Sequence, residues 1–65
     1  MRILVNGAWR EIEGGQLAAA LGELGYEDAA VATALNGEFV AVALRGHTRL
    51  ADGDRLEVLA PMQGG

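Results

Sequence analysis

The dipeptide Asn-Gly occurs twice in this chain, at residues 6–7 and at residues 36–37. Each copy separates two short segments that are rich in apolar residues. A two-residue hairpin turn of type I′ needs positive φ at both central positions, and Asn followed by Gly satisfies that need best. The sequence therefore predicts two antiparallel hairpins, one at the start of the chain and one beyond its middle.

The remaining patterns predict one helix and further strands. Leu17, Leu21 and Leu24 are spaced so that they share one face of a helix over residues 16–24. Gly25 suits the left-handed position that closes the last turn of such a helix. Strands are expected over residues 2–5, 8–13, 31–35, 38–42 and 55–60, with an irregular or short helical segment over 46–50 and a turn at 52–54.

This order of elements, β-β-α-β-β-β, favours one particular α+β architecture. A last strand that pairs in parallel with the first places both inside the sheet and leaves the edges to shorter strands. The result is a ubiquitin-like β-grasp fold, a mixed sheet of about five strands packed on one main helix. The expected core consists of Ile3, Val5, Leu17, Leu21, Leu24, Leu35, Leu56 and Val58.

Two leucines are out of phase with this core. Leu4 and Leu59 alternate with core residues of their strands, so we expect them on the sheet face away from the helix. A small sheet without a second layer leaves that face near water, where clustered apolar side chains indicate a partner surface. Leu4 and Leu59 are therefore candidate interface residues, with ordinary half-buried side chains as the alternative.

The composition excludes several classes of function. The chain has 65 residues, enough for one domain, and no apolar run near the roughly 20 residues of a membrane span. We therefore expect a cytoplasmic protein without a membrane partner. A net charge of −4 argues against binding to nucleic acid, which needs a basic surface. There is no cysteine or serine that His47 could activate, so we do not expect an enzyme.

The cations are five arginines and no lysine, so the chain cannot be linked to itself through lysines. Arg45, His47 and Arg49 form a small basic cluster in the sequence. We expect a solvated loop there, because exposed ion pairs contribute little. Contact with a phosphate or an acidic partner is the alternative.

The residues after the last strand predict a tail. Pro61 ends the strand because proline has no N–H to donate, and Met62, Gln63, Gly64 and Gly65 show no apolar period. We expect a β-grasp domain over residues 1–60 and a flexible C-terminal tail over residues 61–65. The last group is then an α-carboxylate on a spacer without side chains. Taken alone, the tail also fits a frayed end without function.

Over its full length the chain resembles the ThiS family of sulfur carrier proteins. The resemblance rests on Leu35-Asn36-Gly37-Glu38, on Asp52-Gly53-Asp54 before the last strand, and above all on the closing Val58-Leu59-Ala60-Pro61-Met62-Gln63-Gly64-Gly65. Family members often carry Val-Pro-Arg after the Asn-Gly-Glu, where this chain has Phe39-Val40-Ala41-Val42. Partner contacts that the family makes there are not carried onto this chain.

The resemblance implies a carrier cycle. An adenylating enzyme of the ubiquitin-activating type, ThiF-like, uses ATP to convert the Gly65 carboxylate into an acyl-adenylate. A sulfur donor turns the adenylate into a thiocarboxylate, and a ThiG-like thiazole synthase uses that sulfur for the thiazole ring of thiamine. Pro61, Met62, Gln63 and Gly64 would enter the partner's active site. The chain itself would be a monomer that binds no cofactor or metal.

Three alternatives remain open at this point. A small subunit of molybdopterin synthase would share the fold and the thiocarboxylate but bind a different large subunit. A protein modifier would be attached to its targets through Gly65, and deleting that residue would abolish the adducts. A non-covalent binding module would keep its function when Gly64 and Gly65 are deleted.

Overall fold

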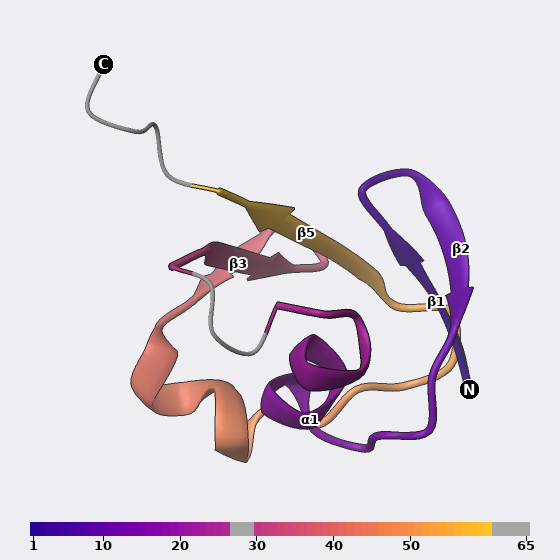
Figure 1. Cartoon of the computed structure of the whole chain (residues 1–65), viewed down its shortest axis with the longest axis horizontal. Helices are drawn as coiled ribbons and strands as arrows, with labels where there is room; N and C mark the ends of the chain where they lie inside the picture. Colours follow the sequence, from indigo (N-terminus) through magenta and orange to yellow (C-terminus); the bar gives the residue numbers. More distant parts are fainter. Residues whose placement is uncertain (27–29, 61–65) are drawn as a thin grey trace.

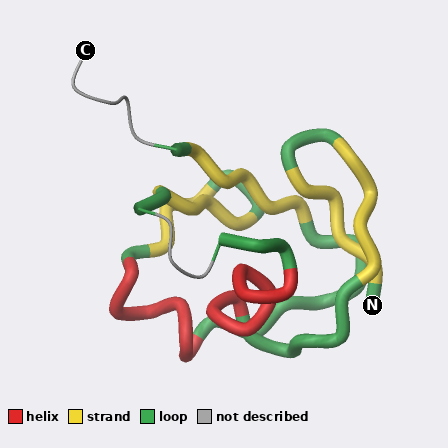
Figure 2. The backbone as a smooth tube through the Cα atoms, in the orientation of Figure 1, coloured by secondary structure: helices red, strands yellow, loops and turns green. Residues whose placement is uncertain are grey.

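The computed structural model describes residues 1–26 and 30–60. A five-stranded sheet lies on one side of the molecule and the helical segments cover its inner face (Figures 1 and 2). The elements in chain order are β1 (Arg2–Val5), β2 (Ala8–Glu11), α1 (Leu17–Glu23), β3 (Ala32–Leu35), β4 (Glu38–Val40), the 3-10 helix η1 (Val42–His47) and β5 (Arg55–Leu59). The α+β class predicted from the sequence is confirmed.

The strand order in the sheet is β2-β1-β5-β3-β4. β1 and β5 pair in parallel, whereas the β1–β2, β3–β4 and β3–β5 pairs are antiparallel. β5 thus occupies the middle of the sheet, and β2 and β4 form the edges. This is the β-grasp topology that a parallel pairing of the first and last strands requires.

Both predicted hairpins are present. Asn6 and Asn36 have φ of 49° and 51°, and Gly7 and Gly37 have φ of 85° and 87°. Positive φ at both central positions is the requirement of a type I′ turn. The two-residue loops fix the registers, with Val5 opposite Ala8 and Leu35 opposite Glu38.

The approach to α1 depends on one carboxylate and one glycine. Glu23, at the end of α1, accepts hydrogen bonds from the backbone N–H groups of Glu13 and Gly14. A Cβ built on Gly14 would lie 2.8 Å from Glu23 Oε2 and 3.0 Å from Ala19 Cβ, so a larger residue does not fit without movement. Gly25 follows α1 with φ +92°, the left-handed closing position expected from the sequence.

The segment after β4 differs from the prediction. The strand expected over residues 38–42 ends at Val40, and η1 begins at Val42 rather than near residue 46. The side chain of Arg45 accounts for the position of η1. Its Nη2 donates to the Val31 carbonyl at 2.6 Å and its Nε to Thr33 Oγ1 at 3.1 Å. These bonds hold η1 against β3. The prediction of a fully solvated basic loop is therefore wrong for Arg45, which is half-buried.

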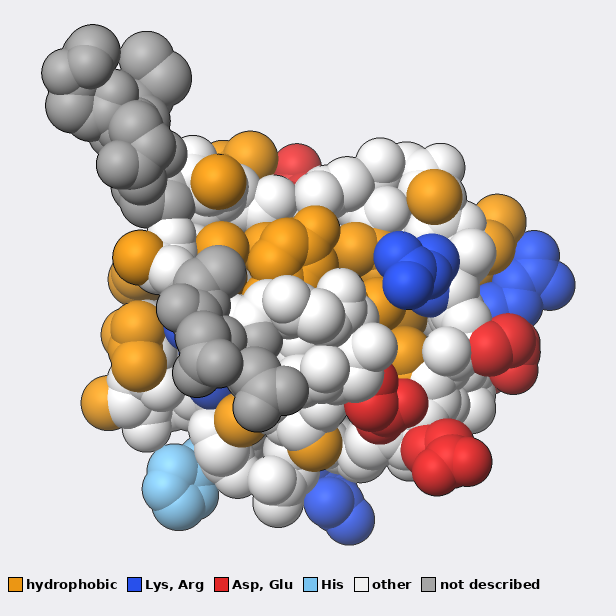
Figure 3. Space-filling model, in the orientation of Figure 1, with side chains coloured by type: hydrophobic (Ala, Val, Ile, Leu, Met, Phe, Trp, Pro, Cys, Tyr) orange, Lys and Arg blue, Asp and Glu red, His pale blue; other side chains and the backbone are white. Residues whose placement is uncertain are grey.

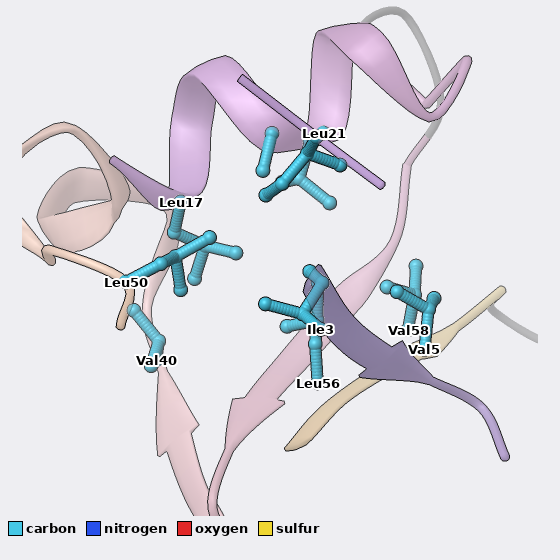
Figure 4. Close-up of a cluster of buried hydrophobic side chains, with 10 residues drawn as sticks. Ile3, Val5, Leu17, Leu21, Val40, Leu50, Leu56 and Val58 are labelled. Atoms are coloured by element: carbon cyan, nitrogen blue, oxygen red, sulfur yellow. The ribbon is translucent and has the colours of Figure 1, made fainter. Parts of the chain in front are cut away.

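The core lies between α1 and the inner face of the sheet (Figure 4). Six of the predicted core residues are buried, namely Ile3, Val5, Leu17, Leu21, Leu56 and Val58, while Leu24 and Leu35 are partly buried against them. Ile12, Ala20, Val40 and Leu50 also belong to the core. Long-range backbone bonds bring two of these additions inward: Ile12 N donates to Met1 O, and Leu50 N donates to Gly15 O, both at 2.8 Å.

Candidate functional site

The candidate partner surface is the outer face of the sheet, which α1 does not cover. Strand alternation separates the two faces clearly in β5, where Leu56 and Val58 are buried and Leu59 is 64% exposed. In β1, Leu4 is half-buried between the buried Ile3 and Val5. The sequence singled out Leu4 and Leu59 for this face.

The structure does not bring Leu4 and Leu59 together. Leu4 is paired with Arg55 in the parallel register, so Leu59 lies four residues further along β5, about 13 Å away at the usual rise per strand residue. The exposed side chains of Arg55 and Glu57 precede Leu59 on β5. The outer face therefore carries two separate apolar areas rather than one.

The first area surrounds Leu4. Trp9 is its direct partner across the β1–β2 hairpin and is 51% exposed. The guanidinium of Arg2 lies 4.5 Å from the centroid of the Trp9 ring, which is a favourable cation–π distance. Arg2 and Trp9 also line a shallow pocket together with Asp52 and Gly53. We call Leu4, Trp9 and Arg2 the β1–β2 patch.

The second area surrounds Leu59. Leu59 is paired with Ala32 of β3, and Ala34, two residues on, is paired with Phe39 of β4, which is 73% exposed. We call Leu59, Ala32, Ala34 and Phe39 the β5-end patch; the exposed Glu57, which is the β5 partner of Ala34, lies at its edge. In Figure 3, apolar side chains gather in the left half and the centre of the view, over η1 as well as near the end of β5, and most charged side chains in view lie in the right and lower parts.

Sequence reasoning missed Trp9 and Phe39, although the signal was available. A two-residue hairpin loop at residues 6–7 places residue 4 opposite residue 9. The same loop length at residues 36–37 places residue 34 opposite residue 39. Directly opposite residues of an antiparallel pair share a face. Counting outward from each Asn-Gly turn would therefore have found both aromatic residues.

The tail residues proposed from the sequence, Pro61 to Gly65, lie outside the described residues. The structure describes the strand that leads to them, β5, and the following Ala60. The β5-end patch is therefore the described surface nearest in sequence to the tail.

The comparisons with known proteins decide the family. The model of the ThiS family matches residues 3–65. The chain belongs to the ThiS family. Members are sulfur carrier proteins of thiamine biosynthesis rather than enzymes.

Two solved structures from Geobacter metallireducens support this assignment. The crystal structure of a thiamine biosynthesis protein, ThiS, is similar with a TM-score of 0.84 and 32% identity, and 100% of each chain is covered. The solution structure of a thiamine biosynthesis protein is similar with a TM-score of 0.78 and 30% identity, covering 100% of this chain and 88% of that one. None of the curated proteins searched matches the chain.

Two negative findings apply to residues 1–26 and 30–60. No helix in these ranges is long and apolar enough to cross a membrane. The same ranges hold no group of three or more His, Cys, Asp or Glu side chains that could bind a metal ion.

Proposed function

We propose that this ThiS family member carries sulfur as a thiocarboxylate on Gly65. The observation that supports the proposal most strongly is the family match, which extends through residue 65 and so includes the diglycine. The chain has no cysteine, so it has no thiol on which to hold sulfur as a persulfide. We place the carried sulfur on the carboxyl group of Gly65, at the end of the diglycine that the family match includes.

The chemistry proceeds in two steps on a partner enzyme of the ubiquitin-activating type. A carboxylate is a poor electrophile, so an oxygen of the Gly65 carboxylate first attacks the α-phosphorus of ATP and pyrophosphate leaves. The partner's cations offset the repulsion between the two anions. A sulfur nucleophile then attacks the activated carbonyl carbon, and AMP leaves with the electrons of the broken C–O bond. The thiocarboxylate passes its sulfur to a thiazole synthase.

The residues of the tail suit this task. Gly64 and Gly65 have no Cβ, so the backbone can enter a narrow cleft. Residues 61–65 span roughly 16–18 Å when fully extended, enough to reach a buried active site while the sheet docks outside. Pro61, Met62 and Gln63 would enter the same cleft behind Gly64 and Gly65.

We further propose that the β5-end patch is where the partner docks. Its exposed members Leu59 and Phe39 are 64% and 73% exposed, and apolar side chains clustered at that level are typical of binding surfaces. Leu59 is also only two residues before Pro61, so a partner seated on it lies beside the start of the tail. Leu4, in the β1–β2 patch, would then contact the partner at the margin.

Intact-mass measurement tests the carrier function. The protein is incubated with ATP, a ThiF-like adenylating enzyme and sodium sulfide. We expect a mass gain equal to the replacement of one oxygen by one sulfur, mapped to Gly65 by fragmentation. The matched control is a variant truncated after Gln63, which should gain no mass.

An unchanged mass, with the same enzyme active on another carrier, would overturn the proposal. Adducts joined through Gly65 to lysines of other proteins would instead indicate a protein modifier. Sulfur transfer to a molybdopterin synthase large subunit, and not to a thiazole synthase, would indicate the molybdopterin-type carrier.

A further inference from the structure

Both hairpin asparagines use their side-chain amides to hold β5. Asn6 Oδ1 accepts a hydrogen bond from Val58 N at 2.9 Å, and Asn6 Nδ2 donates to Val58 O at 3.0 Å. At the opposite end of the strand, Asn36 Oδ1 accepts from Arg55 N at 2.9 Å and its Nδ2 donates to Asp54 Oδ1 at 3.1 Å. The two amides therefore hydrogen-bond to the middle strand of the sheet near its two ends.

The Asn6 amide continues the parallel ladder after the backbone has left it. Leu4 N donates to Asp54 O and Asn6 N donates to Leu56 O, so every second carbonyl of this stretch accepts from β1. The next acceptor in that series is Val58 O. The chain turns away at Asn6-Gly7, and Asn6 Nδ2 supplies the missing donor. One side chain thus replaces a further residue of β1.

This position lies where β5 loses its support on one side. Toward β3, β5 stays paired as far as Leu59, which is opposite Ala32. Toward β1, the last residue of β5 in register is Leu56, opposite Val5. In Figure 1 the β1–β2 hairpin curves away while β5 runs on beside β3. The Asn6–Val58 pair is therefore the contact that fixes the end of β5 on the β1 side.

We propose that Asn6 is a positioning residue for the carrier reaction, acting through Val58 on the place where the tail begins. The inference rests on the proposed function. Val58 lies three residues before Pro61, so the Asn6–Val58 pair helps to fix the position of the last described residues, Leu59 and Ala60, from which the tail continues. Reaction of a terminal carboxylate on a partner enzyme requires close alignment of the reacting atoms, and small misplacements are costly.

Glycine substitutions at the two turns provide the test. Asn6→Gly removes the amide but keeps a residue that accepts positive φ, so the hairpin is preserved. Asn36→Gly is the matched control, because it removes the same kind of amide from the same kind of turn at the end of β5 away from the tail. Asn6→Asp is a second variant: it keeps the turn and the acceptor for Val58 N but cannot donate to Val58 O.

The first measurement is amide hydrogen exchange, which does not depend on the partner. Exchange at Val58 should accelerate in Asn6→Gly and stay unchanged in Asn36→Gly. The second measurement is the steady-state rate of adenylation of each carrier by the ThiF-like enzyme with ATP. We expect kcat for Asn6→Gly to fall by roughly tenfold with KM within about twofold of the original chain, and Asn6→Asp to behave similarly. Asn36→Gly should keep the original kcat.

The outcomes separate this inference from the proposed function. If the original chain is not adenylated, the carrier function itself fails and the inference fails with it. If the original chain is adenylated and both glycine variants have the same kcat, only the role of Asn6 is overturned. A rise in KM without a fall in kcat would also overturn it, because that result assigns Asn6 to docking.

Discussion

The two faces of the sheet are built from the same few strands but differ in what they determine. On the inner face, Ile3, Val5, Thr33, Val40, Leu56 and Val58 are at most 8% exposed and pack beneath α1, with Leu35 partly buried against them. On the outer face, Leu59 and Phe39 are more than half exposed. The inner face supplies the burial that a 65-residue domain needs, since a chain of this size has little to spare. The outer face contributes less to that burial, and we propose that partners dock on it.

The strongest test of this contrast makes one substitution on each face of one strand. Leu56 is fully buried, so Leu56→Ala removes core contacts and leaves a cavity. We expect a loss of about 3–4 kcal/mol in the free energy of unfolding. Leu59→Ala, three residues away on the outer face, should cost less than about 1 kcal/mol. Urea denaturation followed by far-ultraviolet circular dichroism measures both.

The loss expected for Leu56→Ala is a large share of the total, because a domain of this length is stable by only about 3–10 kcal/mol. If the stability lies near the lower end of this range, a substantial fraction of the variant is unfolded already in buffer. Equal losses for the two substitutions would show that the outer face is packed in solution and would contradict the contrast.

The second test concerns the buried polar residue of the inner face. Thr33 is 2% exposed; its hydroxyl donates to Val40 O at 2.9 Å and accepts from Arg45 Nε. Thr33→Val keeps the shape of the side chain but leaves these groups without their partner. We expect a loss of about 2 kcal/mol in the free energy of unfolding, since an unsatisfied buried group bears its full desolvation cost.

A double-mutant cycle with Arg45→Met sharpens this prediction. Because Thr33 and Arg45 belong to one hydrogen-bond network, the double variant should be more stable than the sum of the single losses predicts, by about 0.5 kcal/mol or more. Strict additivity would show that the 3-10 helix is held against β3 by something other than this network.

The inner face was the more predictable of the two from sequence. Each Asn-Gly pair meets the positive-φ requirement of a type I′ turn and so locates a hairpin. Strand alternation then assigns Ile3, Val5, Leu56 and Val58 to one face. Both signals lie within a few residues of their effect. The start of η1 was missed because Arg45 bonds to Val31 and Thr33, residues that are distant along the chain, and no local pattern encodes such a contact.

The outer face shows the same limit more sharply. Alternation was enough to assign Leu4 and Leu59 to it, but their separation depends on the offset between β1 and β5. That offset is set by the parallel pairing of β1 with β5, which lie near opposite ends of the sequence, with Leu4 opposite Arg55. Nothing near either strand specifies it. The tail, by contrast, was predicted from its residue types alone, and it lies outside the described residues.

The prediction with the smallest expected effect concerns which patch of the outer face binds the adenylating partner. Leu59→Asp places a charge in the β5-end patch, and we expect the dissociation constant for the ThiF-like enzyme to rise roughly tenfold while the fold is retained. Trp9→Asp, in the β1–β2 patch, is the matched control and should raise it by less than about threefold, because a partner that takes up the tail is centred near Leu59. Isothermal titration calorimetry measures both constants.

Each outcome of this comparison changes the picture of the outer face in a definite way. Equal weakening by the two substitutions would mean that the partner spans both patches, across Arg55 and Glu57, and that these charges are part of its footprint. Weakening by Trp9→Asp alone would move the docking site to the β1–β2 patch and would require the tail to reach back across the sheet. Unfolding of Leu59→Asp would show that Leu59 is structural, and the division between a face that holds the fold and a face that meets partners would no longer stand.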